Sequence, residues 1–177
     1  MTRAVAGPEP SQGSVPSTTA SPPGNGYWLV GADGSVYPFG VPAFGSLSTA
    51  PPARPITGGT ATPDGQGYWL VGTDGGIFAF GDAGFYGSTG AMRLNSPIVA
   101  MAATPSGQGY WLVAGDGGIF AFGDAGFYGS TGSILLNKPI AGLSASATGR
   151  GYRFVASDGG LFSFGDAPYA GSAAGRP

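Results

Sequence analysis

The chain has 177 residues, of which 7 are Lys or Arg and 9 are Asp or Glu, so its net charge is -2. It contains neither Cys nor His, which excludes disulfides, zinc–thiolate sites, cysteine nucleophiles and histidine-based catalysis. A mildly acidic, charge-poor chain is a poor candidate for binding nucleic acid or an anionic membrane. We therefore expect no nucleic-acid partner and no membrane insertion.

The two ends of the chain differ in composition from the rest. Residues 1–13 are rich in Ser and Pro and are predicted to be a flexible tail or a linker remnant, and residues 173–177 a second short tail. The first eight residues lack the apolar core of a signal peptide. No apolar run approaches the roughly 18 residues of a membrane span. The folded part is expected between the tails, over 14–172.

This folded part consists of four similar units. The string Gly-Tyr-Trp-Leu-Val begins at Gly26, Gly67 and Gly109, and a diverged copy, Gly-Tyr-Arg-Phe-Val, begins at Gly151. Self-similarity at a period of about 42 residues indicates a repeat architecture, which explains why Gly and Pro make up about 29% of the chain without implying disorder. The predicted units are 14–54, 55–96, 97–138 and 139–172.

The third unit shows the elements expected in each copy. Its apolar, β-branched and aromatic runs predict four antiparallel strands: Ile98–Ala103, Tyr110–Val113, Ile119–Phe122 and the short Phe127–Gly129. Turn-forming residues separate these runs, and no helical period is present. Asp116-Gly117 predicts a tight hairpin of type I′, because this dipeptide tolerates a positive φ.

Both faces of the middle strands have to be covered, because residues of both parities are apolar in Tyr-Trp-Leu-Val and Ile-Phe-Ala-Phe. Four-stranded antiparallel units repeated every 40 to 45 residues are typical of β-propeller blades. We predict an all-β propeller with four blades per chain, either a four-bladed ring or half of an eight-bladed ring completed by a homodimer. A β-solenoid or an open β-array is the alternative, although Asp-Gly hairpins favour antiparallel meanders.

Residues 67–90 and 109–132 share the string Gly-Tyr-Trp-Leu-Val-x-x-Asp-Gly-Gly-Ile-Phe-Ala-Phe-Gly-Asp-Ala-Gly-Phe-Tyr-Gly-Ser-Thr-Gly. This string resembles a repeat of secreted actinobacterial proteins that is often appended to cell-wall or extracellular hydrolases and is regarded as propeller-forming. The resemblance implies an accessory module that is extracellular or cell-wall associated. The chain departs from the pattern at Val41, where the other units have Asp, and at Arg153, where they have Trp.

The aspartates fall into two repeated columns. Those directly before a hairpin Gly are expected to form turns: Asp33, Asp74, Asp116 and Asp158. Those between the third and fourth predicted strands are Asp82, Asp124 and Asp166. An Asx-turn role is the simpler interpretation of the second column. In a propeller, however, these carboxylates form a ring on the face that also carries Asp64, and such a ring is suited to a cation or to sugar hydroxyls. No calcium-loop spacing is present, so no metal or cofactor is predicted.

Two tyrosines lie on the predicted outer strand, Tyr86 and Tyr128. We align them with Gly45 and Ala170 in the end units, so the core does not require an aromatic ring there. Exposed tyrosine beside Asp and Ser forms the amphipathic surface that stacks on sugars, and covering of the sheet edge is the alternative role. The predicted ligand-binding set is Tyr86, Tyr128, Asp82, Asp124, Asp166 and Asp64.

These patterns predict a non-catalytic binding or accessory module, lectin-like towards cell-wall or other polysaccharide. A structural or protein-interaction scaffold that oligomerises through its blades is the alternative. A glycosidase with paired carboxylates is less favoured, because the aspartates occupy repeated turn positions and only Asp64 breaks the symmetry. No enzyme activity is therefore expected. Arg153, in place of Trp at one blade face, is predicted to mark the seam where the ring closes or a second chain docks.

Overall fold

The computed structural model of the chain describes residues 16–20, 22, 24 and 26–174, and this part contains strands and no helix. The all-β prediction is therefore confirmed. No helix long and apolar enough to cross a membrane occurs among the described residues. The strands form four antiparallel sheets in chain order. The sheets are β1 (Pro16–Ala20), β2 (Tyr27–Gly31) and β3 (Val36–Phe39); β4 (Ile56–Ala61), β5 (Gly67–Gly72) and β6 (Ile77–Gly81); β7 (Ile98–Ala103), β8 (Gly109–Ala114) and β9 (Ile119–Gly123); and β10 (Ile140–Ala145), β11 (Gly151–Ala156) and β12 (Leu161–Gly165).

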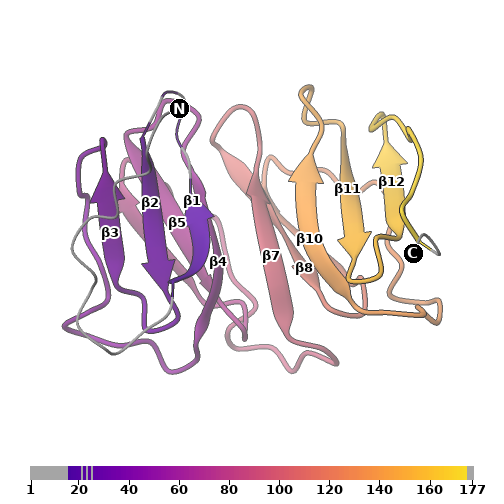
Figure 1. Ribbon diagram of the computed structural model, residues 1–177, viewed down its shortest axis with the longest axis horizontal. Helices are drawn as coiled ribbons and strands as arrows, with labels where there is room; N and C mark the ends of the chain where they lie inside the picture. The colour runs from indigo at the N-terminus through magenta and orange to yellow at the C-terminus, as the bar shows by residue number, and fades with distance from the viewer. Residues whose placement is uncertain (1–15, 21, 23, 25, 175–177) are drawn as a thin grey trace, which may run out of the picture.

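The four sheets stand side by side in an open arc (Figure 1). The first strand of each sheet contacts the first strand of the next, from β1 through β4 and β7 to β10. In the described part of the chain, β1 and β10 make no comparable contact, and the first and last sheets lie at opposite sides of the molecule. The four sheets of the described residues therefore turn through only part of a circle. One chain therefore does not close the predicted four-bladed ring.

Each sheet has three strands, so the predicted fourth strand is wrong. The segment Phe127–Gly129 pairs with no strand of its own sheet, and the equivalent segments of the other described units behave alike. Its backbone instead meets a tyrosine side chain of the next sheet. The Tyr152 hydroxyl accepts a hydrogen bond from the Tyr128 N–H at 3.0 Å and donates one to the Gly129 carbonyl at 2.6 Å. A side chain thus replaces the strand ladder and links consecutive sheets.

The hairpin between the second and third strands also differs from the prediction. Gly117 has a φ of +81°, but no non-glycine residue in the described part of the chain has a positive φ. A type I′ turn requires positive φ at both central residues, so this prediction is wrong. The turn is stabilised instead by Asp116, whose Oδ1 accepts a hydrogen bond from the Gly118 N–H at 2.9 Å. The Ala114 N–H donates a hydrogen bond to the Gly118 carbonyl at 2.8 Å, which closes the turn that contains Gly117.

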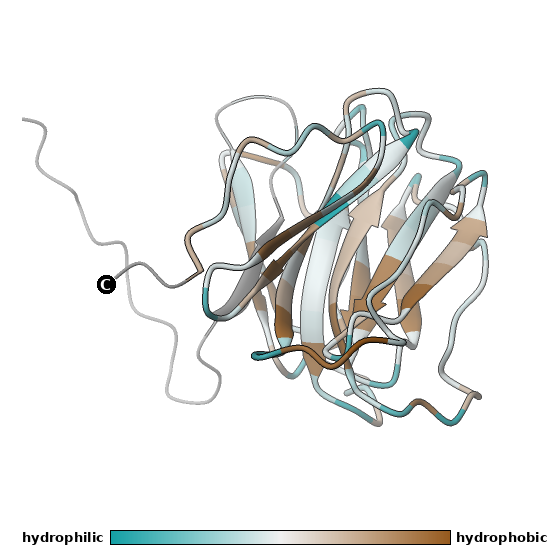
Figure 2. Cartoon of the chain, turned by 90° about the vertical axis from the view of Figure 1, so that its right-hand side faces the viewer, coloured by the Kyte–Doolittle hydropathy of each residue, from teal (hydrophilic) through white to brown (hydrophobic). Residues whose placement is uncertain are grey.

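The core lies between the sheets, as the two-sided apolar pattern of the middle strands predicts. Residues on opposite faces of β8 belong to different clusters: Trp111 packs with the following sheet, and Tyr110 with the preceding one. Every residue of β5 and β8 is buried. In Figure 2, the strands carry much of the hydrophobic sequence, and hydrophilic residues gather in the loops and at strand ends.

Candidate functional site

A carboxylate held by hydroxyl groups recurs in the loop that follows the third strand. In the third sheet, the Thr104 hydroxyl donates to Asp124 Oδ1 at 2.8 Å, and the Ser106 hydroxyl donates to Asp124 Oδ2 at 2.5 Å. The two hydroxyls belong to the turn between β7 and β8, so the cluster links two loops at one edge of the sheet. Asp124 itself is exposed, and its carboxylate is therefore accessible to a ligand.

The fourth sheet repeats this cluster with Asp166. The Thr148 hydroxyl donates to Asp166 Oδ2, and the Ser146 hydroxyl lies 3.1 Å from that of Thr148. The hydrogen bond from the Thr148 hydroxyl, and after it the nearby Ser146 hydroxyl, lower the pKa of the Asp166 carboxyl below its ordinary 3.8. The positive charge of Arg150 acts in the same direction. The Asp166 carboxylate is therefore ionised at neutral pH and held in place by the Thr148 hydroxyl.

The second sheet has a second acid in place of one hydroxyl. Asp64 stands where the third sheet has Ser106, and its Oδ1 accepts hydrogen bonds from the Gln66 N–H at 3.1 Å and the Thr62 hydroxyl at 2.8 Å. The Gln66 N–H, followed by the Thr62 hydroxyl, lowers the pKa of Asp64, and the nearby Asp82 side chain contributes in the same direction. The structure thus brings Asp64 and Asp82 together. No group of three or more acidic side chains suited to a metal ion occurs among the described residues.

The aspartates of the hairpins are engaged within their own turns. In each copy, Oδ1 accepts a hydrogen bond from the backbone N–H two residues further on, at 2.9 to 3.0 Å. The four residues are Asp33, Asp74, Asp116 and Asp158. This geometry is that of an Asx turn, which the sequence analysis assigned to the second column and not to these hairpin positions.

The tyrosines expected on an exposed outer strand lie at the joints between sheets. The Tyr86 hydroxyl donates to the Gly107 carbonyl at 3.0 Å, and its ring centroid is 5.8 Å from that of Tyr110. Tyr128 makes the equivalent hydrogen bond, to the Gly149 carbonyl at 3.2 Å. Both side chains are half-buried. They are therefore not the open stacking platforms that the sequence predicted.

The alignment of the first unit needs a related correction. Phe44, and not Gly45, takes the place of Tyr86, because its ring packs 6.1 Å from Tyr68 as that of Tyr86 packs on Tyr110. Gly45 instead matches the glycine that follows this tyrosine, since its carbonyl accepts the hydrogen bond from the Tyr68 hydroxyl. The joint between the first two sheets therefore does contain an aromatic ring.

The loops expose other aromatic residues, which the sequence analysis missed. Phe85 is 64% exposed, Phe127 66% and Tyr169 61%. Each lies three residues after a carboxylate of the second aspartate column, on the same loop. Alternation in an extended segment indicates only that the two neighbouring aromatic side chains point to opposite sides. If the tyrosine of Phe-Tyr points inward, the phenylalanine points to solvent.

Arg153 retains one contact of the tryptophan that it replaces. Its Nε donates to the Pro168 carbonyl at 3.0 Å. The indole N–H groups of the equivalent tryptophans donate to the matching loop carbonyls at 2.6 to 2.9 Å. The guanidinium thus preserves the loop contact at the outer face of the last sheet.

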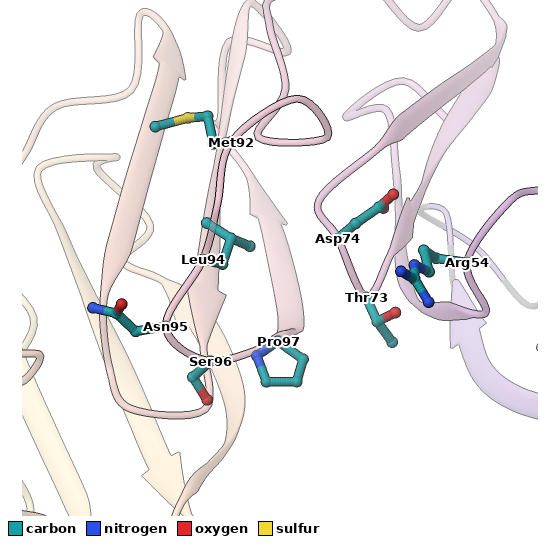
Figure 3. A pocket seen from close by; sticks show the side chains of 8 residues that line it. All are labelled: Arg54, Thr73, Asp74, Met92, Leu94, Asn95, Ser96 and Pro97. Atoms are coloured by element: carbon teal, nitrogen blue, oxygen red, sulfur yellow. The ribbon is translucent and has the colours of Figure 1, made fainter.

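The connections between sheets form shallow hollows. One of about 280 Å³ is lined by Arg54, Thr73 and Asp74 on one wall and by Met92, Leu94, Asn95, Ser96 and Pro97 on the other (Figure 3). Met92 is 57% exposed. None of the predicted ligand-binding residues lines this hollow, so it is separate from the carboxylate and aromatic loops.

No protein-family model and no curated protein matches the chain. Among solved structures, it is similar to the β-propeller domain of Cps50 (Swd1) from Myceliophteria thermophila, with 11% sequence identity and a TM-score of 0.54. The alignment covers 88% of this chain and 53% of that chain. The likeness shows a β-propeller fold, and the chain spans about half the length of the propeller domain that it matches.

Proposed function

We propose that this chain is a non-catalytic binding module of an extracellular or cell-wall-associated protein and that its ligand is a polysaccharide. The observation that carries the proposal is a repeated pair of side chains on one loop, an exposed aromatic ring and an exposed carboxylate. The pairs are Phe85 with Asp82, Phe127 with Asp124, and Tyr169 with Asp166.

The chemistry of these pairs suits a sugar. An aromatic face packs against the apolar C–H face of a pyranose ring, and a carboxylate accepts hydrogen bonds from its hydroxyl groups. The hydrogen bonds from Ser106 and Thr104 leave acceptor capacity on Asp124, since an ionised carboxylate has about four lone-pair sites. Each pair alone forms a weak site. Three of them on one chain favour a polymer, because linked sites raise apparent affinity by about 10²- to 10⁴-fold.

The arrangement of the acids supports binding over hydrolysis. Glycosidases hold two carboxyl groups roughly 5 to 9.5 Å apart, with the sugar between them. The Asp64 carboxylate is already engaged by the Thr62 hydroxyl and the Gln66 N–H of its own turn, which suits a structural or binding role better than acid–base catalysis. Asp124 and Asp166 follow different sheets, and each accepts a hydrogen bond from a hydroxyl group and not from a second carboxyl.

The test is retention on insoluble cell walls and a panel of polysaccharides. The decisive variant combines Phe85→Ala, Phe127→Ala and Tyr169→Ala, which remove exposed rings and leave the joints between sheets intact. A matched control combines Met92→Ala, Ile134→Ala and Leu135→Ala, which remove three exposed apolar side chains from the connections between sheets. Far-UV circular dichroism confirms the fold of each.

We expect the wild type and the control to be retained on at least one polysaccharide and the triple aromatic variant to be lost. Equal retention of all three chains would refute the assignment of the site. If the folded wild type binds no polysaccharide, the alternative of a protein-interaction scaffold takes its place. That alternative is favoured by the exposed faces of the two end sheets.

A further inference from the structure

Neighbouring sheets are joined in the same way three times within the chain. At the joint between the second and third sheets, the Tyr110 ring lies 5.8 Å from Trp69, and its hydroxyl donates to the Gly87 carbonyl at 2.6 Å. Gly87 has a φ of +134° and lies against Phe122, so closely that an added Cβ would lie 2.5 Å from the ring. The following sheet thus supplies a tyrosine and a phenylalanine, and the preceding sheet a tryptophan and a glycine.

The last sheet carries the half of this joint that a preceding sheet supplies, but no described sheet packs against it. Gly171 keeps the positive φ of the joint glycines, at +117°, yet nothing lies within 4 Å of a Cβ built on it. Val155 is 40% exposed, whereas its equivalents Val30, Val71 and Val113 are fully buried. Arg153 holds the place of the joint tryptophan. A face shaped for a following sheet is therefore open to solvent.

The first sheet carries the half that a following sheet supplies, namely a tyrosine and a phenylalanine. Tyr27 is 39% exposed and Phe39 42% exposed, whereas the equivalent tyrosines Tyr68, Tyr110 and Tyr152 are fully buried. The rings of Tyr27 and Phe39 stack on each other at 5.1 Å, as the tyrosine and phenylalanine of each later sheet lie 5.4 to 5.8 Å apart. The Tyr27 hydroxyl has no hydrogen-bond partner among the described residues.

We propose that the first sheet of a second copy of this chain docks, head to tail, on the last sheet of the first copy. The Tyr27 hydroxyl of one copy then donates to the Gly171 carbonyl of the other, and Phe39 fills the space beside that glycine. The Arg153 guanidinium takes the tryptophan's place against the Tyr27 ring, as a cation on an aromatic face. Three internal joints with the same residues at the same positions are the template for this contact.

The dimensions of the arc fit two copies. One chain aligns with 53% of a propeller domain, so a second copy supplies about the missing half of such a ring. Two copies together contain twice the four sheets of one chain, and this number is the upper end of the roughly four to eight blades that propellers contain. A head-to-tail contact closes into a ring when its rotation permits and otherwise grows into a filament.

The experiment is sedimentation velocity of the intact chain over a range of concentrations. We expect the mass to rise from the 17.4 kDa of one chain to about twice that value or more. Tyr27→Asp and Gly171→Val, each on one half of the joint, should weaken association at least about tenfold, and Arg153→Trp should strengthen it. Phe85→Asp is the control, because it charges an exposed ring on a loop outside both end faces.

Mixing the two weakened variants tests the head-to-tail geometry. The last sheet of the Tyr27→Asp chain and the first sheet of the Gly171→Val chain are both unchanged, so together they form one native joint. The mixture should associate more tightly than either variant alone. A single-chain mass at every concentration, or association that neither variant weakens, would overturn the proposal. Circular dichroism verifies that each variant is folded.

Discussion

The glycines at the joints between sheets offer a matched pair of substitutions. Gly87 and Gly171 share a positive φ, at +134° and +117°, but only Gly87 has a neighbour within 4 Å of an added Cβ. We therefore compare Gly87→Ala with Gly171→Ala. Both changes place an L side chain in an unfavourable backbone conformation, which costs about 1–3 kcal/mol.

Only Gly87→Ala adds a steric cost. Its Cβ would lie 2.5 Å from Phe122 Cδ1, inside a joint whose tyrosine and tryptophan are fully buried. Overpacking of this kind costs about 1–3 kcal/mol. Gly87→Ala should thus destabilise the chain by about 2–6 kcal/mol, and Gly171→Ala by about 1–3 kcal/mol. Gly129→Ala should match Gly87→Ala, since its Cβ would lie 2.5 Å from Phe164.

The assay is urea unfolding followed by tryptophan fluorescence, at a protein concentration low enough to keep the chain monomeric. The free energies of unfolding of the three variants are compared with that of the wild type. Equal losses for Gly87→Ala and Gly171→Ala would refute the reasoning, because they would show that contact with Phe122 contributes nothing to the cost.

Two further predictions concern side-chain hydrogen bonds. Tyr110→Phe removes the hydroxyl that accepts from the Tyr86 N–H at 3.1 Å and donates to the Gly87 carbonyl, so it should lower the free energy of unfolding by about 1–3 kcal/mol in the same assay. A loss under about 0.5 kcal/mol would show that the hydroxyl does not hold the loop. The pKa of Asp166 is lower in the folded chain than in the unfolded chain. The ionised carboxylate therefore stabilises the fold fully at a pH above its unfolded-state pKa, and this stabilisation is lost as the pH falls through its folded-state pKa. Thr148→Val should move that pKa up towards 3.8 in an NMR titration of the carboxyl carbon, and an unchanged midpoint would contradict the assigned cause.

Much of the fold was predictable because each unit repeats both its apolar pattern and its turn residues. The Gly-Tyr-Trp-Leu-Val strings located β2, β5 and β8, and the two-sided pattern placed the core between sheets. The fourth strand was mispredicted because Phe127–Gly129 has strand-like residues but finds its hydrogen bonds on Tyr152. Periodicity shows which residues are buried and not which partner satisfies the backbone.

The candidate site was predicted only in part for a related reason. The repeated carboxylates were found by position, yet their hydroxyl partners, such as Thr104 and Ser106, come from another loop about 20 residues away. Tyr86 and Phe85 are adjacent and both aromatic, so composition alone did not tell which of them faces solvent. Nor did the sequence fix ring closure, because the rotation between sheets depends on three-dimensional packing.

The most direct measurement is the apparent dissociation constant for a retained polysaccharide across single, double and triple substitutions of Phe85, Phe127 and Tyr169 by Ala. An aromatic contact of about 0.5–1.5 kcal/mol corresponds to a loss of about two- to thirteenfold for each ring removed. The account predicts that the three losses are similar and accumulate. A triple variant that binds as tightly as the wild type would contradict it.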